Sequence, residues 1–119
     1  MTRLDTYVAA QRPARIDVVK MDVEGAELPA LRGCAAGLRA FHPVVVCELC
    51  GAWTHAFEYE PSDVIDELRR AGYTTFHLVT GRGDLSPLAD VRALNDGESR
   101  DIVATAGGAH ASRIRRLVR

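Results

Sequence analysis

Lysine is nearly absent from this 119-residue sequence, in which Lys20 stands alone against fourteen arginines. The formal net charge is -1, so no overall positive charge would draw the chain to nucleic acid or to an anionic lipid surface. The sequence has no apolar run long enough to span a bilayer and no apolar leader with a cleavage site. We therefore expect a cytoplasmic protein with neither a nucleic-acid nor a membrane partner.

Cysteine is also scarce, and the three residues Cys34, Cys47 and Cys50 do not describe a disulfide framework. Cys47 and Cys50 have the spacing of metal ligands, but zinc needs further ligands and His55 is the only imidazole nearby. We predict no metal site, and a small zinc or thiol protein is kept only as a third hypothesis.

The stretch that organises the chain is 16–28, which runs from an apolar segment into a cluster of charge and then into a helical pattern. This order predicts a strand over 16–21, a turn that Gly25 allows, and a helix from about 26 to 38. In open α/β sheets, ligands bind outside the carboxyl ends of the strands, so the charged cluster falls where a site is expected.

Asp22 and Glu24 are the first candidates for chemistry, because a carboxylate beside a bound hydroxyl can orient it or take its proton. The structural alternative is that both acids cap the following helix. For Glu27, in the first helical turn, the helix dipole is the better explanation. Lys20 either holds an anionic substrate group or forms a salt bridge at the strand end.

The next strand, predicted over 44–49, ends in Glu48, which should face the same crevice as Asp22 unless it bonds a neighbouring loop. A loop over 51–60 follows. Its aromatic residue Trp53 either lines a substrate pocket or belongs to an apolar lid on the sheet.

The rest of the chain predicts a helix that starts at Pro61 and ends before Gly72, then a strand over 74–79. A mostly looped segment over 80–98 and a short last strand over 100–106 follow. The basic residues in 109–119 can form a helix or a frayed tail. The segment 1–119 reads as one domain.

The central stretch also resembles a known family. Val19 to Glu27, followed by Leu31-Arg32-Gly33, looks like the signature of FkbM-type methyltransferases. Several flanking segments agree with it in the right order, and together the resemblance covers about 2–78. These flanking segments are 2–8, 43–49 and 71–73.

The resemblance implies an α/β fold: a partial Rossmann-like methyltransferase sheet with three mainly parallel strands, a last antiparallel strand and flanking helices. It implies S-adenosylmethionine as cofactor and a hydroxyl of a small molecule or sugar as acceptor. Asp22, Glu24 and Glu48 would be catalytic, and Lys20 and Trp53 would bind substrate. The glycine-rich first strand and the acidic second strand, which hold the cofactor in that fold, are absent from the sequence.

Two consequences follow from the missing half. Either another chain supplies it or this stretch is a piece of a longer enzyme, or else the chain is a non-catalytic remnant or interaction module. In the isolated chain, the strand 16–21 would have an unpaired edge with few protective charges, so we expect a homodimer or a partner chain to pair there. The alternative is that residues 1–15 fold back over this edge.

Overall fold

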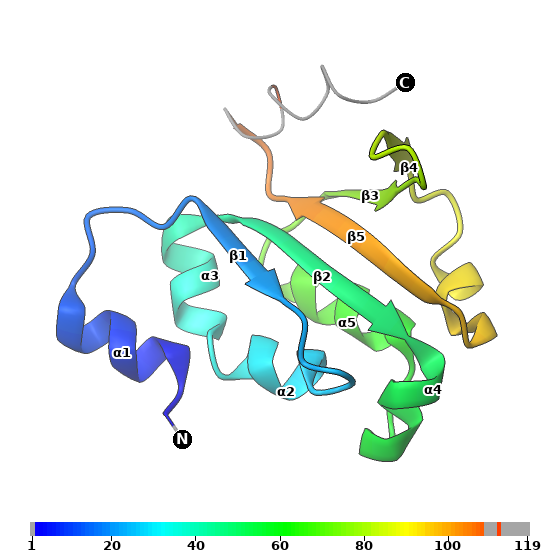
Figure 1. The fold of residues 1–119 in the computed structure, drawn as a ribbon. Helices are drawn as coiled ribbons and strands as arrows, with labels where there is room; N and C mark the ends of the chain where they lie inside the picture. The colour runs from blue at the N-terminus through cyan, green and yellow to red at the C-terminus, as the bar shows by residue number, and fades with distance from the viewer. Residues whose placement is uncertain (1, 109–111, 113–119) are drawn as a thin grey trace.

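Five strands form one mixed sheet in the computed structural model, which describes residues 2–108 and 112 (Figure 1). The first two strands are parallel to each other, and the last strand lies antiparallel between the second and the third. This antiparallel insertion of the last strand confirms the prediction. In spatial order the strands are β1 (Val18–Met21), β2 (Val44–Cys50), β5 (Ser99–Thr105), β3 (Thr75–Val79) and β4 (Leu85–Pro87).

The helices α2, α3 and α5 lie along one face of the sheet (Figure 1). Among the residues that the structure describes, no helix is long and apolar enough to cross a membrane. The helical elements are α1 (Leu4–Gln11), α2 (Glu27–Arg32), α3 (Ala35–Phe41), α4 (Gly51–Thr54), α5 (Pro61–Arg70), and the 3-10 helices η1 (His55–Phe57) and η2 (Val91–Asp96).

The alternation of side chains along β2 separates the two faces of the sheet. Val45, Cys47 and Leu49 are buried in the main core beneath the helices. Val44 and Val46 point to the opposite face, where they pack on a smaller apolar cluster that includes Val103 and Leu85. The side chains of β2 that face away from the helices therefore include Val44, Val46 and Glu48.

The single helix predicted over 26–38 is wrong, because the chain forms α2 and α3 with a break at Gly33 and Cys34. The Asp5 carboxylate explains the restart. It accepts hydrogen bonds from the backbone amides of Ala36 (3.0 Å) and Gly37 (2.8 Å), which are unpaired amides in the first turn of α3. A cap supplied from 31 or 32 positions away cannot be read from local spacing.

Two segments predicted as loops contain regular structure. The loop over 51–60 is largely α4 and η1, and the segment 80–98 holds β4 and η2. The sheet consequently has five strands where four were predicted. β4 was missed because it is three residues long and ends in Pro87, a residue tolerated in a sheet only at an edge such as this one.

The outer edge of β1 has no strand neighbour in the described part of the chain. Residues 4–11 do not fold back along β1 as the alternative required; α1 instead docks on α3 through the Asp5 contacts (Figure 1). The predicted basic helix or tail over 109–119 lies outside the described residues, apart from residue 112.

Candidate active site

A buried carboxylate holds the turn between β1 and α2. Glu27 is only 1% exposed, and its side chain accepts hydrogen bonds from the backbone amides of Val23 (3.2 Å) and Gly25 (3.1 Å). These bonds give the charge the partners that burial demands. Glu27 thus fixes the turn through specific contacts, a more definite role than the general dipole interaction predicted for it.

Tyr59 locks the same turn from the other side. Its hydroxyl donates to the carbonyl oxygen of Gly25 at 2.6 Å and lies 3.3 Å from the Glu27 carboxylate. Burial raises the pKa of the Tyr59 phenol to about 12, so the hydroxyl stays protonated near neutral pH.

Gly25 is required by both its conformation and its surroundings. Its φ is +102°, and a methyl group there would lie 2.6 Å from the backbone oxygen of Trp53. The turn is therefore pressed against α4. The preceding residue, Glu24, also has a positive φ of 49°, and it is exposed.

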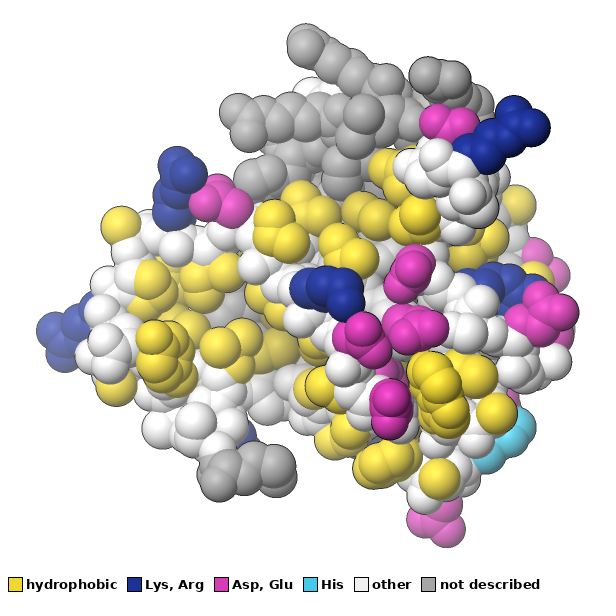
Figure 2. Space-filling model, viewed as in Figure 1, with side chains coloured by type: hydrophobic (Ala, Val, Ile, Leu, Met, Phe, Trp, Pro, Cys, Tyr) yellow, Lys and Arg dark blue, Asp and Glu magenta, His cyan; other side chains and the backbone are white. Residues whose placement is uncertain are grey.

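Four charged side chains gather at the carboxyl ends of β1 and β2. Lys20 donates to Asp22 at 3.0 Å, and this hydrogen bond raises the pKa of Lys20, with smaller contributions from the charges of Asp101 and Glu48. Figure 2 shows acidic side chains grouped around a basic one over these strand ends. The pairing of Glu48 with Asp101 across β2 and β5 places both on the face that the helices leave uncovered.

The other predicted residues, Glu24 and Trp53, lie on the segments that follow β1 and β2. Glu24 is exposed on the turn, and neither Asp22 nor Glu24 caps α2, whose N-cap is Ala26 without a side-chain bond. Trp53 is half-buried in α4, with its backbone against Gly25. Glu48 accepts a hydrogen bond from the Ser99 hydroxyl, so its partner is the neighbouring strand and no loop.

The two closely spaced cysteines have separate environments. Cys47 is fully buried in the core, where burial raises the pKa of its thiol, whereas the Cys50 thiol lies 3.4 Å from the Gly97 carbonyl oxygen. Within residues 2–108 and 112, no group of three His, Cys, Asp or Glu side chains is arranged to hold a metal ion. The zinc hypothesis gains no support from this arrangement.

Three residues of the site were missed or undervalued from sequence. Asp101 and Ser99 lie beside Glu48 only because β5 inserts next to β2. Their spacing of two from Val103 does predict that all three side chains lie on the same face of the sheet. Tyr59 falls in the segment predicted as a loop over 51–60, and no local pattern connects it to Gly25, 34 residues earlier.

Comparison with known proteins gives one match. The family model described as the methyltransferase FkbM domain matches residues 1–75. No curated protein and no solved structure matches the chain.

Proposed function

The chain belongs to the FkbM methyltransferase domain family, and from that premise we propose that it forms the acceptor side of a methyltransferase. The donor is S-adenosylmethionine, and the acceptor is a hydroxyl group of a small molecule or sugar. The observation that carries this proposal is the cluster of Lys20, Asp22 and Glu48 at the carboxyl ends of adjacent parallel strands, where α/β sheets bind ligands.

In the proposed reaction, a carboxylate of this chain would orient the acceptor hydroxyl and take its proton. Asp22 suits this role because its carboxylate pairs with Lys20 at 3.0 Å, is about half exposed, and makes no bond to the backbone amides of the turn. Lys20 and Glu48 would orient the remaining polar groups of the acceptor. The cofactor, when bound, supplies an activated methyl group.

We assign no residue of this chain to the cofactor. The sequence has no glycine-rich turn after a first strand. At Gly25, whose φ is positive, the backbone of Trp53 occupies the space where a ligand could otherwise approach. We therefore expect the isolated chain to bind S-adenosylmethionine weakly or not at all. Calorimetry tests this directly, and a dissociation constant in the low micromolar range would contradict it.

The role of Asp22 is tested by Asp22→Asn in a preparation that includes the cofactor-binding strands and transfers methyl groups. We expect turnover to fall on the order of a hundredfold or more, with an unchanged free energy of unfolding. Asp17→Asn is the matched control, because Asp17 forms a similar exposed ion pair with Arg15 before β1. Full activity of Asp22→Asn, or its unfolding, would remove Asp22 from the mechanism.

The same proposal includes an added strand at the outer edge of β1, contributed by a second copy or by a separate chain. Val18 is 58% exposed on β1, so the edge is apolar as well as unpaired among the described residues. Sedimentation at micromolar concentration should show association. A clean 13.0 kDa monomer whose Val18–Met21 amides resist hydrogen exchange would refute it.

A further inference from the structure

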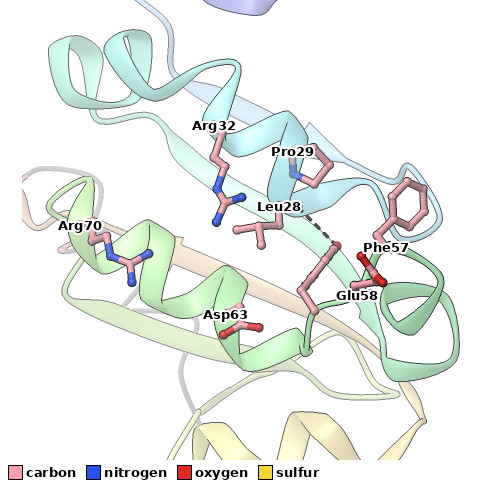
Figure 3. A pocket seen from close by; sticks show the side chains of 8 residues that line it. Leu28, Pro29, Arg32, Phe57, Glu58, Asp63 and Arg70 are labelled. Carbon is pink, nitrogen blue, oxygen red and sulfur yellow. Dashed lines mark hydrogen bonds between the residues drawn. The ribbon is translucent and has the colours of Figure 1, made fainter.

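A groove runs between α2 and α5 on the helical side of the molecule, away from the acidic cluster (Figure 3). Its volume is about 490 Å³, in the range of small-molecule sites. A second hollow of about 330 Å³ adjoins it, because Glu58, Tyr59 and Asp63 line both. The two hollows together form one elongated site, the α2–α5 groove.

The charges in this groove are separated by sign. Arg32 from α2 and Arg70 from α5 line the first hollow, and both approach the same carboxylate, Glu67, at 3.7 Å and 3.1 Å. Two guanidinium groups thus share one acid, which leaves donor capacity for another anion. Figure 3 shows the two arginines at the end of the groove opposite Glu58.

The second hollow is acidic. It is lined by Glu58, Glu60 and Asp63, and the only nitrogen base there, His55, already contacts Glu60 at 3.1 Å. The Asp63 carboxylate accepts a hydrogen bond from the backbone amide of Glu60, whereas the Glu58 side chain is exposed to solvent. An organic ammonium suits this end, because it forms charge-assisted hydrogen bonds with carboxylates.

Apolar side chains connect the two ends. Leu28 is 4% exposed beneath the groove and Phe57 is 50% exposed at its rim, so an aromatic ring lies open beside a buried aliphatic floor. Tyr59 also lines the groove, with its hydroxyl already bonded to the Gly25 carbonyl oxygen. A ligand here would gain from burying apolar surface on Phe57.

We propose that the α2–α5 groove binds a short peptide with free ends: its carboxylate meets Arg32 and Arg70, its ammonium group meets Glu58, and an apolar side chain packs on Phe57 and Leu28. This site is independent of methyl transfer and lies apart from the proposed acceptor site.

The probe is the dipeptide leucyl-phenylalanine, titrated into the ¹⁵N-labelled chain and followed by amide chemical shifts. Leu28 is the best reporter, because its amide lies 3.4 Å from the Tyr59 hydroxyl. We expect saturable shifts confined to α2, α5 and 55–60, with a dissociation constant on the order of 1 mM. The C-amidated and N-acetylated forms of the dipeptide should each bind about threefold more weakly, as exposed ion pairs allow.

Charge variants identify which end meets which group. Arg32→Gln and Arg70→Gln should abolish the preference for the free carboxylate but keep the preference for the free amine, and Glu58→Gln should do the reverse. Arg69→Gln is the control, because Arg69 forms the same kind of i,i+3 pair on α5 outside the groove. The absence of saturable shifts, blocked dipeptides that bind as tightly as the dipeptide with free ends, or an equal effect of Arg69→Gln would overturn the proposal.

Discussion

The two halves of the stretch 20–27 both contain acidic side chains, but those side chains lie in opposite environments. The outer half, Lys20, Asp22 and Glu24, is exposed and bonds only within itself in the described structure. The inner half, Gly25 and Glu27, is buried and bonded to backbone and to Tyr59. The comparison indicates that the inner half fixes the turn, whereas the side chains of the outer half stay accessible to a ligand.

Replacing Gly25 should have the largest effect on this division. In Gly25→Ala the new methyl group meets both a positive φ and the Trp53 oxygen, so we expect a loss of about 3 kcal/mol or more in unfolding free energy. Gly83→Ala is the control, because Gly83 also has a positive φ (+79°) but open space around it. Urea unfolding that gives equal losses for the two variants would remove the packing argument.

Glu27→Gln should cost about 2 kcal/mol, because the part-buried amide of Val23 and the buried amide of Gly25 would lose a charged acceptor. The matched change in the outer half is Glu24→Gln. It should stay within about 0.5 kcal/mol of the parent, as expected for an exposed side chain. Comparable losses in the two unfolding curves would erase the distinction between the halves.

Tyr59→Phe should cost about 1 kcal/mol, since it removes the 2.6 Å hydrogen bond to Gly25 and leaves the ring in place. Tyr7, which is 56% exposed, provides the control variant Tyr7→Phe with no measurable loss. The prediction fails if thermal or urea unfolding cannot distinguish Tyr59→Phe from the parent.

His77 sharpens the comparison, because it is a buried polar residue without the partners that Glu27 has. It is 4% exposed, its Nδ1 has no hydrogen-bond partner in the described structure, and burial lowers its pKa below 6.5. The unfolded chain therefore takes up this proton more readily, so stability should fall as pH drops below about 6.5.

His77→Leu should accordingly stabilise the chain by about 0.5 to 1 kcal/mol at pH 7 and reduce the loss between pH 7.5 and 5.5. These values of pH are roughly one unit either side of the usual histidine pKa. Unfolding at the two pH values checks both effects. A destabilised variant with an unaltered pH dependence would mean that His77 has a partner when the chain is in solution.

Much of the fold could be predicted because its signals are local. The β-branched run in 44–49 and the Pro61 start and Gly72 end of α5 each place an element within a residue or so. The position of Asp22 at the end of β1 follows from the same kind of signal. The split of 26–38, the burial of Glu27 and the approach of Asp101 depend on partners from distant segments, which spacing does not encode.

Hydrogen exchange at the Val23 and Gly25 amides tests the central claim most directly, because these two amides bond to Glu27. Compared with the parent chain, Glu27→Gln should speed their exchange roughly tenfold or more. A loss of about 1.4 kcal/mol in the free energy of local opening corresponds to a tenfold faster exchange. Asp22→Asn should leave both rates unchanged. Faster exchange in Asp22→Asn, with none in Glu27→Gln, would show that the outer half holds the turn and would contradict the account.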